Sequence, residues 1–431
     1  MTDPSIQPLA TDRPTPPRWY RWLVLIFVSL TMFGNYYVYD ALSPLADVLK
    51  QQLGFSDENI GLLQALYSFP NIFTVLLGGV VIDRIGVRKS IFIFGVLCFV
   101  GAVITVLTPS LWVMGAGRLV FGMGAESLIV AVTTALAKWF RGKELSFAFG
   151  INLLIARAGS FAALNSPSWA SWAFKDWRLP FLIATGISTL CVVGAVIYWA
   201  MEVRAEKQYS LGEASTDKVV FADLFKFGVS YWYIVMLCIV FYSAIFPFQT
   251  FAVKFFMEAH GASREEGGFL SSMLTLFAMF ATPLFGLMAD RFGKRSLMMM
   301  FGSFLLIPVY LMMAYTHMTL YLPMAMMGVA FSLIPAVMWP SVAYIVDQSK
   351  LGTAYGLMTM IQNIGLFGFN LLIGWANDYS GASQANPGGY SLGMWIFSCL
   401  GFFGVLFAFL LRRNETGPHA HGLETITTTS K

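Results

Sequence analysis

Gly79-Val-Val-Ile-Asp-Arg-Ile-Gly-Val-Arg-Lys89 decides the fold of this chain, because nearly the same stretch returns as Gly286-Leu-Met-Ala-Asp-Arg-Phe-Gly-Lys-Arg295. The copies lie 207 residues apart, from Gly79 to Gly286, and each closes a long apolar run. A short motif that recurs after about half of an apolar chain is typical of membrane proteins built from two parallel halves. The sequence therefore predicts an all-α integral membrane fold with two pseudo-symmetric halves.

The composition indicates that the chain lies in a bilayer. Of its 431 residues, 57% are hydrophobic and only 12% are charged, a balance too apolar for a water-soluble globule. The net charge of +4 gives no indication of a nucleic-acid partner. All four cysteines lie in apolar runs without metal-ligand spacing, so we expect no disulfide, no metal site and no cofactor.

Apolar runs of about 20 residues, the length that crosses about 30 Å of hydrocarbon, predict twelve transmembrane helices in two groups of six. The first six are expected at 22–42, 60–82, 90–107, 111–136, 145–168 and 179–201, and the second six at 229–257, 267–289, 296–315, 320–345, 354–375 and 391–411. The expected domains are a tail (1–18), a six-helix bundle (19–201), a linker (202–228), a second six-helix bundle (229–412) and a second tail (413–431). Within the linker we expect one surface helix, at 221–227.

The distribution of Lys and Arg predicts the orientation. With the N-terminus in the cytoplasm, 20 of the 27 basic residues lie outside the spans on the cytoplasmic side and five lie on the other side. Because cytoplasmic loops carry an excess of Lys and Arg, we expect both termini in the cytoplasm. The first 17 residues are expected to form a polar tail rather than a cleavable signal peptide, because they contain no apolar segment.

The repeated turn contains residue types that suit a tight connection between two helices. Gly79 and Gly286 are expected to let helices approach closely, and Gly86 and Gly293 to form the turn itself. The second copy is one residue shorter after its second glycine, so we do not expect the two turns to act identically.

This turn resembles the cytoplasmic loop signature of the major facilitator superfamily, whose carriers use it to latch their two halves in one state of an alternating-access cycle. The resemblance implies a latching role for a set of charged residues, for which anchoring the topology is the alternative. They are Asp83, Arg84, Arg88, Asp290 and Arg291.

Three charged residues lie well inside predicted spans of the first half, away from the span ends. Arg118 and Glu126 are eight residues apart in one span, about 80 degrees apart around the helix, and Arg157 lies in the next span. Burying such a charge costs on the order of 3 kcal/mol, so these side chains should face the protein interior or water. Glu126 and Arg157 lie about 16 Å and 18 Å from the cytoplasmic ends of their spans, so their depths match.

The matched depths allow two interpretations of Glu126 and Arg157. In the first they form a static ion pair that only joins two helices. In the second they bind opposite ends of a zwitterion, because a carboxylate attracts an ammonium group and a guanidinium attracts a carboxylate. Glu126 is also a candidate proton carrier. Arg118 is expected either to partner the polar end of the first span or to pack helices together, and the structural role is favoured.

The sequence around these charges resembles a narrower family. The matching stretches are Gly117-Arg-Leu-Val-Phe-Gly-Met-Gly-Ala-Glu126, Lys138-Trp-Phe-Arg-Gly-Lys-Glu144 and Ala156-Arg-Ala-Gly-Ser160. They resemble the family of major facilitator superfamily domain-containing protein 1, which includes lysosomal dipeptide carriers. The resemblance implies that Glu126 and Arg157 contact the two termini of a peptide.

The chain departs from the eukaryotic members of that family in its targeting signals. Its N-terminal tail has no acidic dileucine motif, and Asn414-Glu-Thr416 is expected on the cytoplasmic side, where it would not be glycosylated. We therefore expect a bacterial carrier of the plasma membrane, without the family's lysosomal glycoprotein partner.

Polar and aromatic residues at mid-depth are further candidates for a substrate cavity. They are Asn35, Tyr36, Tyr39, Tyr67, Tyr242, Gln249, Gln362 and Asn363. The second half has no charge at mid-membrane depth, so recognition of substrate charge should fall to the first half.

The sequence thus predicts a monomeric carrier of dipeptides, either a uniporter or proton-linked. The alternative is a proton-coupled transporter of organic anions or sugar acids, in which Arg157 binds the anion and Glu126 the proton. A membrane sensor that does not transport would need a cytoplasmic signalling domain, for which the linker and tails are too short. An enzyme is not expected, since the four histidines lie in turns or the tail without a nucleophile or a metal partner nearby in the sequence.

Overall fold

The computed structural model describes residues 14–140, 144–211, 226–316, 318–418 and 420–427, which are almost entirely helical. The helices of the first half are α1 (Arg18–Asp40), α2 (Ala46–Leu53), α3 (Asp57–Ile85), α4 (Val87–Leu107), α5 (Leu111–Phe140), α6 (Leu145–Leu164), α7 (Ser166–Trp169) and α8 (Arg178–Gln208). Those of the second half are α9 (Val229–His260), α10 (Arg264–Phe292), α11 (Arg295–Tyr315), α12 (Tyr321–Ile345), α13 (Leu351–Tyr379) and α14 (Ser391–Glu415). Short 3-10 turns join some of them: η1 (Ser43–Leu45), η2 (Ser171–Lys175), η4 (Gln348–Lys350) and η5 (Pro387–Tyr390).

Twelve segments of the described chain are long and apolar enough to cross a membrane, six in each half, as the apolar runs predict. The first of them extends to Leu53, beyond the predicted end at residue 42, because η1 and α2 continue it. Likewise α8 continues to Gln208 and includes the first seven residues of the expected linker. The surface helix predicted at 221–227 falls mainly on residues 212–225, outside the part of the chain that the structure describes.

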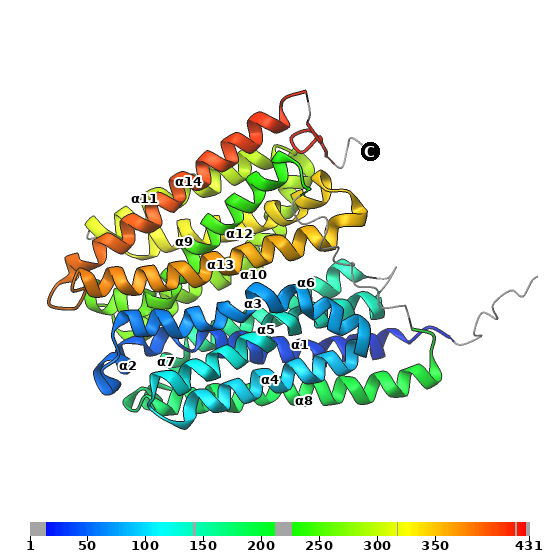
Figure 1. Ribbon diagram of the computed structural model, residues 1–431, viewed down its shortest axis with the longest axis horizontal. Helices are drawn as coiled ribbons and strands as arrows, with labels where there is room; N and C mark the ends of the chain where they lie inside the picture. Colours follow the sequence, from blue (N-terminus) through cyan, green and yellow to red (C-terminus); the bar gives the residue numbers. More distant parts are fainter. Residues whose placement is uncertain (1–13, 141–143, 212–225, 317, 419, 428–431) are drawn as a thin grey trace, which may run out of the picture.

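The two halves form two layers of roughly aligned helices (Figure 1). In that view α1 begins and α14 ends at the right-hand end of the bundle, which we call the terminal end. The opposite end, where α2 and α7 lie, is called the distal end. Between the layers, α3 packs along α13 and α6 packs along α10.

The internal repeat extends to the caps of the long helices. Ser56 caps α3 in a reciprocal capping box with Asn59, and Ser263, 207 residues later, caps α10 by accepting from the backbone N–H of Glu266. Both helices end at the glycines of the repeated turn. Gly86 and Gly293 have φ values of +85° and +63°, which glycine adopts without steric penalty, so their predicted role in the turn is confirmed.

The buried apolar side chains show where the halves are joined. One cluster fills the middle and the terminal end of the first half. The other fills the second half and includes distal residues of the first half, such as Leu45, Leu49 and Phe55. The halves therefore share one core at the distal end and have separate cores toward the terminal end.

The repeated turn differs from the prediction at its first glycine. A Cβ atom added at Gly79 or Gly286 would meet nothing within 4 Å, so these residues do not mediate a close helix approach here, and that prediction is wrong for this conformation. The residue before Gly79 does so instead, because a Cβ at Gly78 would lie 3.1 Å from Oγ of Ser127 on α5. The rotation of α3 about its axis, which a turn motif does not encode, decides between the two positions.

Candidate functional site

A cavity of about 290 Å³ lies between the two halves and is lined by four helices of each. The first half contributes Asn35, Tyr36, Tyr39, Asp40, Tyr67, Val75, Glu126, Ile129, Val130 and Arg157, from α1, α3, α5 and α6. The second half contributes Tyr242, Phe246, Gln249, Thr275, Trp339, Thr359, Gln362 and Leu366, from α9, α10, α12 and α13. Twelve of these 18 lining residues have polar side chains, so the cavity combines polar groups with aromatic and aliphatic walls.

Glu126 enters the cavity from α5, where one of its carboxylate oxygens accepts a hydrogen bond of 3.2 Å from the hydroxyl of Tyr67. The ring of Tyr67 is in turn held edge-on by Tyr39, with ring centroids 4.7 Å apart. Asn35 is fixed nearby by donating to the carbonyl of Ala125. Packing and hydrogen bonds from α1 and α3 therefore orient the Glu126 carboxylate.

Arg157 enters the cavity from α6, and its guanidinium lies between two aromatic rings. Its Cζ atom is 5.4 Å from the ring centre of Tyr36 on α1 and 5.2 Å from that of Phe331 on α12. Such contacts stabilise a cation without neutralising it. The buried Nε atom has no hydrogen-bond partner among the described residues, so the guanidinium keeps donor capacity for a ligand.

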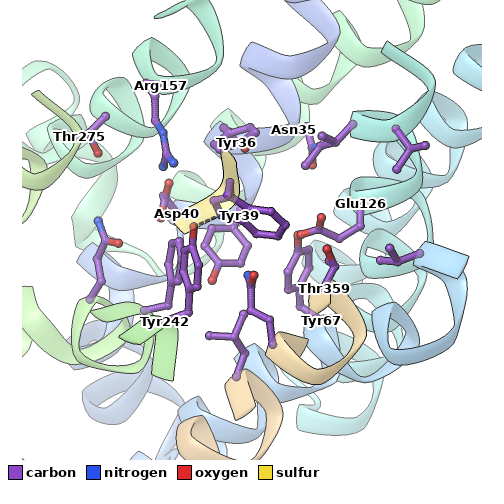
Figure 2. Close-up of a pocket in the computed structure, with 18 residues that line it drawn as sticks. Asn35, Tyr36, Tyr39, Asp40, Tyr67, Glu126, Arg157, Tyr242, Thr275 and Thr359 are labelled. Atoms are coloured by element: carbon purple, nitrogen blue, oxygen red, sulfur yellow. Dashed lines mark hydrogen bonds between the residues drawn. The ribbon is translucent and has the colours of Figure 1, made fainter. Parts of the chain in front are cut away.

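Figure 2 shows Arg157 and Glu126 on opposite sides of the cavity, with the rings of Tyr36 and Tyr39 between them. Within the described part of the chain neither side chain forms an ion pair, with the other or with any other residue; Glu126 bonds to Tyr67 and Arg157 contacts aromatic rings. The static ion pair that the matched depths allow is therefore not formed. The two opposite charges face one shared space.

The sequence analysis missed Asp40 as a cavity residue. It is the last residue of α1 and lies on the Arg157 side of the cavity (Figure 2). Its position at the end of the first apolar run suggests the membrane surface, but η1 and α2 continue that span to Leu53 and so place Asp40 well inside it. An acidic residue within a longer apolar segment was the available signal.

The second half lines the cavity with neutral polar and aromatic groups. Trp339 donates to the hydroxyl of Tyr242 over 2.9 Å, and the ring of Tyr242 stacks on Phe246. The side chains of Gln249 and Gln362 complete this wall. Among the described lining residues Asp40, Glu126 and Arg157 carry formal charges, all from the first half, as the sequence predicts.

Two predicted residues lie away from the cavity. Asn363 is buried in α13 and donates to the carbonyl of Thr359 in its own helix, whereas its neighbour Gln362 faces the cavity. Arg118 is buried and donates to the carbonyl of Val38 in α1 and to the side chain of Gln64 in α3. These contacts support the structural role expected for Arg118.

The charged residues of the two turns have different surroundings. Arg88 pairs with Glu206 of α8 at 2.5 Å, while Asp83 and Arg84 are exposed. In the second turn Asp290 pairs with Arg295 at 3.1 Å, and Arg291 is exposed. Arg295 also donates to the carbonyl of Ile426, so the C-terminal segment covers the second turn.

Comparison with known proteins identifies the family. The sequence model of the Major Facilitator Superfamily matches residues 28–253 and 235–427. The chain belongs to this superfamily. It is therefore a multi-pass membrane transporter of a small molecule rather than an enzyme, and the superfamily that its two turns resemble is confirmed.

The narrower resemblance is confirmed as well. The lysosomal dipeptide transporter MFSD1 of Danio rerio is 32% identical over 376 residues, which cover 84% of this chain and 82% of that protein. The human protein of the same name is 31% identical over 376 residues, which cover 84% of this chain and 81% of that protein.

A solved structure shares the fold of this superfamily member. A bacterial homologue of the human lysosomal transporter Spinster, in an inward-facing and unoccupied conformation, aligns with a TM-score of 0.73 at 17% identity. The alignment covers 92% of this chain and 98% of that one. At this identity the likeness concerns the fold alone.

Proposed function

We propose that this protein transports dipeptides by alternating access, with Glu126 and Arg157 binding the two ends of the substrate. The observation that supports this most directly is that the two opposite charges face each other across one cavity without pairing. Unpaired charges inside a membrane are costly, so a ligand that neutralises both at once gains binding energy from each. The MFSD1 relatives, which are named dipeptide transporters, support the same substrate class.

The proposed contacts follow from the chemistry of each wall. The ammonium group of the peptide binds the Glu126 carboxylate, and the peptide carboxylate binds the fork of Arg157 donors. Gln249, Gln362 and the hydroxyl of Tyr242 face the cavity from the other half and are suited to hydrogen-bond the peptide group. Because these contacts involve the backbone of the substrate, side chains of different kinds are tolerated.

The volume of the cavity supports a short substrate. About 290 Å³ is at the lower limit of the volumes typical of small-ligand sites. A zwitterion must also be long enough to reach both Glu126 and Arg157. We therefore propose dipeptides rather than single amino acids or long peptides.

The transport cycle that we propose is a rocking of the halves about this site. The protein acts as a monomer in the plasma membrane with both termini in the cytoplasm, as the excess of basic residues on that side suggests. The charged residues of the two turns, Asp83, Arg84, Arg88, Asp290 and Arg291, are proposed to latch the halves at the terminal end when the distal end opens. Transport is either uniport or proton-linked.

A thermal-shift experiment with chemically blocked ligands tests the substrate class. Alanyl-alanine should stabilise the purified protein, by about 2.7 kcal/mol at 100 times its Kd, because it binds the folded state alone. N-acetyl-alanyl-alanine lacks the ammonium group and alanyl-alanine amide lacks the carboxylate, so neither should stabilise it. Stabilisation by a sugar acid and not by alanyl-alanine would favour the organic-anion alternative.

Substitution of the two charged residues tests their roles in the same assay. Glu126→Gln and Arg157→Ala should each abolish the stabilisation by alanyl-alanine while the protein remains folded. Glu265→Gln and Arg413→Ala change exposed charges and should respond like the original chain. A normal response of both cavity variants would assign Glu126 and Arg157 to the scaffold.

A further inference from the structure

Two ion pairs join the halves at the distal end. In the first, Nζ of Lys254 on α9 lies 2.5 and 2.6 Å from the carboxylate oxygens of Asp57, the first residue of α3, and both side chains are fully buried. In the second, the guanidinium of Arg264, the first residue of α10, binds Asp47 of α2 through two hydrogen bonds of 2.5 and 2.6 Å. Arg264 also donates to the carbonyl of Pro44.

The two pairs are related by the internal repeat. The spacing of 207 residues that relates the two turns also relates Asp57 to Arg264 and Asp47 to Lys254. Each pair thus joins one of these positions in the first half to the other position in the second half. If the second half repeated the sequence of the first at these positions, each contact would place one aspartate against another.

The chain avoids that repulsion by sorting the charges between its halves. Both acids, Asp47 and Asp57, belong to the first half, and both bases, Lys254 and Arg264, belong to the second. The two distal faces therefore have complementary charges at two separate points. Like charges facing each other across such an interface would instead favour separation.

Neighbouring contacts also join the two halves around the ion pairs. The carboxylate of Asp378, at the end of α13, accepts from the backbone N–H groups of Asp57 and Glu58 and so caps α3 from the other half. Gly61 and Gly268, again 207 residues apart, face backbone carbonyls of the opposite half, and a Cβ on either would lie 2.3 Å from the carbonyl oxygen. The faces are thus in direct contact.

None of the four charged residues lines the cavity, so they are not part of the proposed substrate site. Buried charges lose their hydration, and an ion pair compensates for that loss only while its partners remain in contact. When the distal end opens, all four charges regain water. The pairs therefore stabilise the conformation with a closed distal end and lose this role in the opposite one.

We propose that Asp57–Lys254 and Asp47–Arg264 form the distal gate of the transporter. The gate closes the side of the membrane opposite the termini, and its two pairs set the balance between the two orientations of the empty protein. This inference rests on the alternating-access part of the proposed function and not on the identity of the substrate.

Distance measurements on the full-length protein test the gate. Spin labels on Gln51→Cys and Gln384→Cys, in a background without the native cysteines, report the separation of the halves at the distal end, since both positions are exposed there. Arg264→Asp and Asp47→Arg each place like charges opposite one another. Each should increase the ratio of long to short separations by about tenfold or more, and the double exchange Asp47→Arg with Arg264→Asp should restore the short separation.

Matched variants control for the charge itself. Lys175→Asp and Glu265→Lys make the same changes of charge at exposed distal positions and should leave the separations unchanged. Single gate variants that keep the original distances, or a double exchange that stays open, would overturn the proposal.

If a single variant does not fold, a second comparison, between two double variants, still tests the gate. The double exchange should remain closed, whereas Asp47→Asn with Arg264→Gln should open; equal distances in these two proteins would also overturn the gate. The readout needs no ligand, so it is independent of whether dipeptides are the substrate.

Discussion

Asp40 gives the cavity one more negative than positive charge. Glu126 and Arg157 match the two ends of a zwitterion, which leaves the Asp40 carboxylate available on the Arg157 side of the cavity. A cationic side chain on the substrate would balance it. The third charge therefore bears on which dipeptides bind rather than on whether a dipeptide binds.

Replacement of Asp40 should change selectivity. We expect Asp40→Asn to weaken binding of lysyl-alanine by about tenfold, the loss of about 1.4 kcal/mol, and to leave the affinity for alanyl-alanine within about twofold. Titration calorimetry with both ligands measures the two affinities. Asp176→Asn, which removes an exposed distal carboxylate, is the control. An equal loss for both dipeptides would show that Asp40 positions Arg157 instead of reading the side chain.

At the scale of helices, the distal contact depends on α3 and α10 lying directly on the backbone of the other half. Gly61 faces the carbonyl of Asn370 on α13, and Gly268 faces that of Leu164 on α6. No side chain fits in either place without moving a helix, because the nearest atom belongs to a backbone. The same two helices carry glycines near their other ends that face open space.

Alanine substitutions at the two ends of these helices should therefore have different effects on stability. Gly61→Ala and Gly268→Ala should each lower the free energy of unfolding by about 1–3 kcal/mol, because the added methyl group overpacks the contact. Gly79→Ala and Gly286→Ala meet no atom within 4 Å and should be neutral or raise it by up to about 1 kcal/mol, since alanine favours the helix. Thermal unfolding of the purified variants measures the difference. Equal effects at both ends would contradict the close distal contact.

For the whole molecule, the shared core and the ion pairs at the distal end leave the halves joined on the side opposite both termini. Which side of the membrane this is depends on orientation, and the basic residues outside the spans favour cytoplasmic termini. In that orientation, and with the plasma-membrane location proposed above, the cavity is closed toward the outside of the cell.

Labelling of intact cells tests this orientation. With the native cysteines replaced, a membrane-impermeant maleimide should label Gln384→Cys at the distal end and should not label Ala420→Cys in the C-terminal segment, because only the former faces outward. Both positions are exposed, so accessibility within the protein does not limit the reaction. Permeabilised cells should label at both positions. The reverse pattern in intact cells would place the termini outside.

The sequence by itself determined the twelve spans and the two halves, and it placed Glu126 and Arg157 along their spans. These follow from run length and from the position of a charge along a run, which are local properties of a helix in a bilayer. The repeated turn also indicated that the two halves are related by pseudo-symmetry.

Only the tertiary structure decided which polar residues face the cavity and which residues join the halves. Gln362 and Asn363 are neighbours, and one residue of rotation, about 100 degrees, separates the cavity from the packed interior. The distal ion pairs connect residues far apart in the sequence, Asp57 and Lys254 at 197 positions and Asp47 and Arg264 at 217. In the sequence each of these charges looks like an ordinary charged residue near a loop. Contacts between distant segments depend on how helices rotate and pack, which no local pattern contains.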